Sequence, residues 1–120
     1  MFLDQSGHQV GLRQGRSGAE NSAFGLLHLQ IDHGVNEHQA ELLIQDTPAG
    51  ITQGNDRFVY GMTFRVNGDS LVSLQFIEDR KPSNAAPDNY SLGIVTGYCR
   101  GGDQNAPIEN HCPPLPPPFN

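Results

Sequence analysis

Cysteine and histidine are the residues of this chain with the widest choice of chemistry, and both occur in suggestive pairs. The two cysteines, Cys99 and Cys112, bound a polar segment that contains two glycines and a proline. Two of the five histidines, His33 and His38, lie close together in the sequence. Thiols form disulfides, bind metals or act as nucleophiles, whereas imidazoles bind metals or change charge near neutral pH. The spacing of each pair decides which chemistry to expect.

The cysteine pair is best explained as a disulfide that pins the end of the last predicted strand to the C-terminal segment. Such a bridge closes a loop of about 14 residues and stabilises the fold by about 3 kcal/mol in the chain-entropy model. As zinc ligands, Cys99, Cys112 and the neighbouring His111 are one short of a tetrahedral set, and their spacing matches no compact zinc finger. Inert thiols, and a nucleophile made of Cys112 and His111, are the remaining alternatives.

The histidine pair depends on a predicted β-hairpin over residues 24–45, with a four-residue loop at 34–37. This register sets His33 opposite His38 on the face of the buried leucines, while His28 points away from the pair. Two imidazoles there would supply half of a site for a divalent metal, or a pH sensor in which two imidazolium charges repel each other. The structural alternative is a pair of partly exposed polar side chains at the mouth of the hairpin.

The oxygen ligand of such a metal site would be Asp32 or Glu37, the acidic neighbours of the two histidines. No cofactor is predicted, and a divalent metal is the one group that the histidine pair could hold. A competing interpretation of this segment is a short helix, because Asn36 and Gln39 have the spacing of a capping box. The strand is preferred because it accounts for both sides of the turn.

Alternating hydrophobicity predicts three further strands, at residues 57–66, 70–78 and 90–99. The joining segments 46–56 and 79–89 are rich in Pro, Gly, Asn and Asp, which is typical of loops. The predicted fold class is therefore all-β: an antiparallel β-sandwich or small barrel built from two hairpins plus a C-terminal strand.

The register of the central hairpin can be predicted from its side chains. A three-residue loop at 66–68 pairs Tyr60 with Leu74 and Phe58 with Phe76, so that the apolar residues share one face. The opposite face keeps three apolar residues, and we expect it to be a contact face. These residues are Val59, Leu71 and Ile77.

The two ends of the chain differ from its centre. Residues 1–23 are predicted to form a polar arm that includes a short edge strand, and residues 24–112 a single β-rich domain. Residues 113–120 are predicted to form an extended proline-rich tail. The tail contains PxxP spacings that suit an aromatic groove, but a segment lying on the domain is the favoured interpretation. At the end of the second central strand, Glu78 and Arg80 are expected in a solvated turn.

Composition excludes some classes of function. A net charge of -6 with seven dispersed basic residues argues against binding to nucleic acid. No apolar stretch is long enough for a membrane span. Low charge, a single lysine and an even number of cysteines favour an extracytoplasmic mature fragment over a cytoplasmic protein.

The leading hypothesis is a non-catalytic β domain that binds a protein partner or small ligand through loops or an exposed sheet face, because no convincing catalytic constellation is present. A metal-dependent small β-barrel enzyme that uses His33 and His38 is the alternative. A structural subunit of a surface assembly, a homo-oligomer formed through the predicted contact face, is the third hypothesis.

Overall fold

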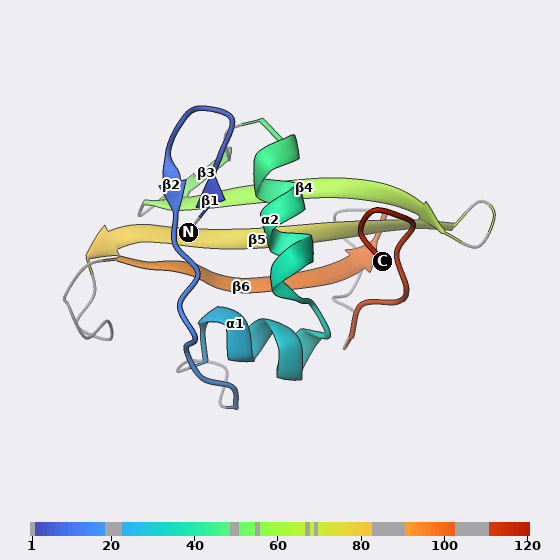
Figure 1. The fold of residues 1–120 in the computed structure, drawn as a ribbon, viewed down its shortest axis with the longest axis horizontal. Helices are drawn as coiled ribbons and strands as arrows, with labels where there is room; N and C mark the ends of the chain where they lie inside the picture. Colours follow the sequence, from blue (N-terminus) through green and yellow to red (C-terminus); the bar gives the residue numbers. More distant parts are fainter. Residues whose placement is uncertain are drawn as a thin grey trace.

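The computed structural model describes residues 2–18, 23–48, 51–54, 56–66, 68, 70–82, 91–102 and 111–120. Within these ranges the fold is mainly β, with two antiparallel sheets and short helical segments (Figure 1). In chain order the elements are β1 (Phe2–Leu3), β2 (Gln9–Val10), α1 (Gly25–Leu27), the π-helical turn η1 (His28–Asp32), α2 (Glu37–Asp46), β3 (Ile51–Gly54), β4 (Arg57–Val66), β5 (Ser70–Pro82) and β6 (Ser91–Gly101).

The larger sheet has the strand order β3-β4-β5-β6, and β1 pairs with β2 in a separate two-stranded sheet. Helix α2 crosses one face of the larger sheet, and the N-terminal hairpin lies on the same face beside it (Figure 1). The coarse prediction of a mainly β, antiparallel fold is therefore confirmed. The described strands do not close into a barrel, and the fold is not built from two hairpins in the predicted way.

The central hairpin of β4 and β5 forms, but its register differs from the predicted one. Val66 pairs with Ser70, which places the loop after Val66, and Tyr60 pairs with Phe76 rather than with Leu74. Phe58 consequently lies opposite Glu78. Because the shift is an even number of residues, the same side chains still face inward, and Phe58 and Phe76 remain on one face. The register prediction is wrong, while the assignment of faces holds.

The predicted first hairpin over residues 24–45 is wrong, because its second half is helix α2. The capping box forms in full: Gln39 N–H donates to Asn36 Oδ1 at 2.8 Å, and Asn36 N–H donates to Gln39 Oε1 at 3.0 Å. Ala40, Leu43 and Ile44 then fall on one side of the helix and are buried against the sheet. The segment is rich in Ala, Glu, Gln and Leu, which favour helix over strand. No helix in the described ranges is long and apolar enough to cross a membrane.

The first half of the expected hairpin is also helical. The N–H groups of Leu26 and Leu27, which have no partner within α1, donate to the carbonyls of Arg13 and Gln14 in the N-terminal arm. The π-helical turn η1 follows directly and lies beside the edge of β6 (Figure 1). An edge strand covered by a helix is protected from pairing with other chains.

Gly93 of β6 allows a close approach of another backbone, as a bare glycine in a strand predicts. Gly93 has a φ of +75° and forms a bridge with Leu12, and the Ile94 N–H next to it donates to Gly11 O at 2.9 Å. The pairing of β5 with β6 shifts register near this point. The arm thus attaches to β6 through Gly11 and Leu12, while β1 and β2 pair only with each other among the described strands.

Both ends of the chain contribute to the hydrophobic core. Phe2 and Val10 from the N-terminal hairpin, and Leu115 and Phe119 from the C-terminal segment, are buried together with the inner face of the sheet. Segment 46–56 was expected to be a loop, but it contains β3, which pairs with β4. That part of the loop prediction is wrong, because the β-branched pair Ile-Thr at the start of β3 suits a strand.

Gly97 offers a test of the contact between η1 and the sheet. A Cβ at this position would lie 2.5 Å from Phe76 Cδ1 and 2.8 Å from Leu29 Cδ2, both buried. We expect Gly97→Ala to lower the free energy of unfolding by about 2 kcal/mol through overpacking. Gly61→Ala is the control, since its Cβ would meet nothing closer than Gln75 Cγ at 3.5 Å. Urea unfolding curves measure both, and equal stabilities would contradict the packing described.

Candidate functional site

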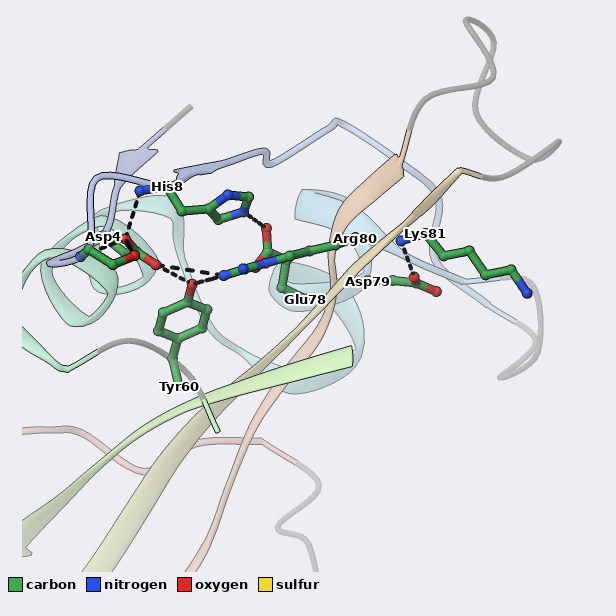
Figure 2. A network of polar contacts seen from close by, with 8 residues as sticks. Asp4, His8, Tyr60, Glu78, Asp79, Arg80 and Lys81 are labelled. Atoms are coloured by element: carbon green, nitrogen blue, oxygen red, sulfur yellow. Dashed lines mark hydrogen bonds and ion pairs between the residues drawn. The ribbon is translucent and has the colours of Figure 1, made fainter. Parts of the chain in front are cut away.

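A cluster of polar side chains lies between the N-terminal hairpin and the inner face of the sheet (Figure 2). At its centre, the Tyr60 hydroxyl donates to Asp4 Oδ2 at 2.7 Å and accepts from Arg80 Nη2 at 3.0 Å. Arg80 Nε donates to Glu78 Oε1 at 2.8 Å, and His8 Nε2 lies 2.8 Å from Glu78 Oε2. We call these five residues the polar cluster. Asp4, Tyr60 and Glu78 are buried.

Sequence alternation and a local turn position this cluster. Tyr60 lies on the inner face of β4, and Glu78 and Arg80, two residues apart, lie on the inner face of β5. Asp4 stands at the turn between β1 and β2, where its Oδ1 accepts from the N–H groups of Ser6 and His8. An aspartate that bonds the backbone two residues further on is typical of such turns.

The surroundings of Asp4, Tyr60 and Arg80 shift their pKa values and so determine their charges. Burial raises the pKa of Asp4, but hydrogen bonds from Ser6, Tyr60 and the His8 N–H lower it more, to about 2. Burial, together with the hydrogen bond given to Asp4, raises the pKa of Tyr60 far above its usual value. Burial lowers the pKa of Arg80, but its bond to Glu78 raises it further, so that the net change is upward. At neutral pH the centre therefore consists of ionised Asp4, ionised Arg80 and a neutral phenol.

The contacts of the polar cluster have a structural role: they connect separate parts of the fold. Both carboxylate oxygens of Asp4 accept from protein donors, and Glu78 is held by Arg80 on one side and His8 on the other. Arg80 also stacks on Phe58, with its guanidinium carbon 3.7 Å from the ring centre. The cluster therefore uses its hydrogen-bonding capacity within the fold, and it fixes the N-terminal hairpin to β4 and β5.

A second polar group lies at the edge of β6. His28 is buried on η1, with Nδ1 2.6 Å from Asp32 Oδ2 and Nε2 3.1 Å from Thr96 Oγ1. The bond to His28 is the main cause that lowers the pKa of Asp32. A carboxylate bonded to an imidazole that is bonded to a hydroxyl is the arrangement that activates hydroxyl nucleophiles in enzymes. Here the imidazole packs edge-on against His33 at 4.7 Å between ring centres. Its Nδ1 bonds within η1, and its Nε2 joins η1 to β6.

The predicted histidine pair is replaced by a different one. His33 packs edge-on against His28 and lies near Tyr98, whereas His38 is exposed in the first turn of α2 beside Glu37. The expectation that His28 points away from His33 is therefore wrong, and the hairpin that would pair His33 with His38 is absent. Among the described residues, no group of three or more His, Cys, Asp or Glu side chains could hold a metal ion.

The disulfide between Cys99 and Cys112 is present, with Cα atoms 5.1 Å apart, so this prediction is confirmed. Cys99 is buried on the inner face of β6. On the other side of the bridge, Cys112 N–H donates to His33 O at 2.9 Å, and His111 Nε2 lies 3.0 Å from Ile31 O. The bridge therefore ties the start of the C-terminal segment both to β6 and to the end of η1.

The three residues of the predicted contact face lie on the outer face of the larger sheet. Val59 pairs with Ile77 across β4 and β5, and Leu71 lies opposite Arg65. Val59 and Ile77 are half-buried, Leu71 is 46% exposed, and none of the three belongs to the hydrophobic core or packs against it. They remain the candidate contact surface.

Sequence reasoning missed the polar cluster. It treated Glu78 and Arg80 as part of a solvated turn, which is wrong, because β5 continues to Pro82 and both side chains face inward. One signal was available: Glu78 has the same parity as the buried Leu74 and Phe76, so a strand that continues must bury it. Nothing in the sequence indicated that Asp4, 56 residues before Tyr60, would be its partner.

Comparisons with protein-family models, with curated proteins and with solved structures found no match to the chain.

The polar cluster predicts a specific loss of stability in acid. The pKa of Asp4 is about 2 in the fold, below its ordinary value of 3.8. A carboxyl with a lowered pKa stabilises the fold above its unfolded pKa, and this contribution disappears as the pH falls through the folded value. We expect Asp4→Asn to be less stable than the wild type by about 1 to 2 kcal/mol at pH 7, after allowance for solvent screening. The difference should shrink between about pH 4 and pH 2.

Urea unfolding at a series of pH values measures this difference. Asp46→Asn, at the exposed end of α2, controls for the loss of one negative charge. If the gap between the wild type and Asp4→Asn is the same at pH 2.5 as at pH 7, the proposed role of the Asp4 carboxylate is wrong.

The disulfide predicts a loss of about 3 kcal/mol in the free energy of unfolding when it is removed, because the bridge spans a sequence separation of 13. Cys112→Ala and the double variant Cys99→Ala/Cys112→Ala should lose similar amounts, since either removes the same bridge. Thermal unfolding with and without reductant measures the loss. A reduced wild type as stable as the oxidised protein would show that the bridge is not what holds the C-terminal segment.

Proposed function

We propose that the protein is a non-catalytic binding domain that takes a protein partner on the outer face of its larger sheet. The observation that carries the proposal is one-sided packing. The main core cluster lies on the inner face of the sheet or on elements packed against it. On the outer face, Thr96 and Tyr98 at the β6 edge contact His28 and His33, while Val59, Leu71 and Ile77 stand outside the core cluster. Apolar side chains that the fold itself does not bury are candidates for burial by a partner.

The composition of this face suits a protein partner. Along the outer face, the Val59 and Ile77 pair is followed by Gly61 and Gln75 and then by Thr63 and Ser73, whose hydroxyls lie 3.0 Å apart. Leu71 projects from the end of the face near the central loop. A face that mixes apolar and polar side chains in this way has the usual composition of a non-obligate protein interface.

The disulfide and the charge support an extracytoplasmic setting for this interaction. Disulfides persist in oxidising compartments, and the bridge here secures a core segment. The net charge of -6 disfavours nucleic acid as the partner. The metal-dependent enzyme, the alternative drawn from the sequence, relied on His33 facing His38 across a hairpin that does not form.

Competition in cross-linking tests this proposal. A photo-reactive amino acid at position 71 should capture a discrete protein from the surface fraction of the source cells, because Leu71 is the exposed apolar residue of the face. Unlabelled wild type should compete for the capture. Leu71→Asp should compete at least tenfold more weakly, since a carboxylate would be buried at the contact.

Leu3→Asp is the matched control, because Leu3 is 55% exposed and lies on β1, away from the outer face. It should compete as well as the wild type. Light scattering measures whether the wild type and Leu71→Asp self-associate. If the wild type forms oligomers and Leu71→Asp does not, the partner is a second copy of the chain. Equal competition by Leu71→Asp and the wild type would refute the outer face as the binding surface.

A further inference from the structure

The C-terminal segment 113–120 is held by a small number of specific contacts. The Phe119 ring packs edge-on against Phe64 of β4, with 4.8 Å between ring centres. The side-chain amide of Gln39 on α2 donates to Phe119 O at 2.7 Å. Leu115 and Phe119 are each 4% exposed and belong to the core, while their neighbours in the segment are more exposed. We call the surface formed by Gln39 and Phe64, together with the core residues around them, the tail site.

The donor in the tail site is oriented without help from the segment that it binds. Gln39 Oε1 accepts from Asn36 N–H in the capping box, which fixes the plane of the amide. Nε2 is therefore directed at the position of the Phe119 carbonyl whether or not that carbonyl is present. A preoriented donor beside an aromatic contact reduces the ordering cost of binding.

The segment itself has the properties of a ligand. Five of the six residues 113–118 are proline, so this stretch has few N–H groups, and the Phe119 N–H bonds within the segment to Pro116 O at 2.9 Å. Its attachment therefore rests mainly on two side chains, Leu115 and Phe119, and on one accepted hydrogen bond. Proline-rich segments are stiff before binding and lose little entropy when they dock.

The disulfide separates this segment from the rest of the chain. Cys112 is anchored to Cys99 and to His33 O, immediately before the first proline of the segment. Because these contacts of Cys112 do not involve residues 113–120, a departure of the segment from the tail site would leave them in place. The attached segment acts at an effective concentration of roughly millimolar, so that a competing segment has to exceed this.

We propose that the tail site recognises an extended proline-rich segment of a partner protein that carries a leucine followed four residues later by an aromatic residue. The chain's own residues 113–120 are its built-in competitor. The site faces the opposite side of the sheet from Val59, Leu71 and Ile77, so that this proposal and the proposed function succeed or fail separately.

A synthetic octapeptide with the sequence of residues 113–120 is the probe, labelled with a fluorophore and titrated into the 120-residue chain. Wild type should bind it weakly, because the attached segment fills the tail site. Phe119→Ala, which weakens that segment and leaves the site intact, should bind it at least tenfold more tightly. An octapeptide with alanine in place of its phenylalanine should not bind Phe119→Ala, since the aromatic contact is lost.

The matched control removes the donor and keeps the helix cap. In Phe119→Ala/Gln39→Glu the carboxylate still accepts from Asn36 N–H, as glutamate does in a capping box, but it cannot donate to the peptide carbonyl. We expect this double variant to bind the octapeptide at least tenfold more weakly than Phe119→Ala. Equal binding by the two variants would overturn the proposal, because the peptide would then be bound elsewhere.

A second measurement covers the case in which Phe119→Ala does not fold. With 4-fluorophenylalanine at position 119 of an otherwise unchanged chain, the ¹⁹F resonance should move from its buried position to that of free peptide as unlabelled octapeptide is added to excess. The alanine-containing octapeptide should leave it in place. A resonance that stays in place with the phenylalanine octapeptide at several millimolar would refute an exchangeable segment.

Discussion

Alternation of side chains along β4 and β5 is the constraint on which the rest of the fold depends. It turns Tyr60, Phe64, Leu74 and Phe76 to one face, and this face forms the floor of the core. Helix α2, the N-terminal hairpin and the C-terminal segment are each too short to bury their apolar side chains alone. They do so by packing on that floor, where each Å² of apolar surface removed from water contributes about 25 cal/mol. The outer face receives none of these elements.

The core contains polar groups that would be costly without partners, and their pairing explains the position of the N-terminal hairpin. The Tyr60 hydroxyl and the Glu78 carboxylate point into the same layer as the phenylalanines. A buried hydroxyl without a partner costs about 1 to 3 kcal/mol, and a buried charge more. Asp4 and His8 from the hairpin, with Arg80 from β5, supply the missing partners. These hydrogen bonds therefore determine where the short N-terminal hairpin of β1 and β2 packs on the sheet.

Gln39 connects the helix to the far end of the chain. One end of its amide completes the cap of α2, and the other holds Phe119. The disulfide fixes the chain just before this contact, so that a covalent and a non-covalent attachment follow each other within a few residues. Because the covalent attachment comes first, the C-terminal segment can belong to the core and still be exchanged for a segment of a partner protein. Binding at the outer face would leave all of these contacts unchanged.

The sequence by itself determined the strands of the central hairpin, the faces of their side chains and the disulfide, because period-two alternation and an isolated cysteine pair are local signals. It did not determine whether residues 37–46 are strand or helix, since the capping box of Asn36 and Gln39 competed with an equally consistent hairpin pattern. Only the tertiary structure decided this, by offering the helix an apolar sheet face on which Leu43 and Ile44 are buried. The imidazole partner of His33 and the carboxylate that accepts from Tyr60 were decided in the same way, because contacts between distant segments depend on packing that no local pattern encodes.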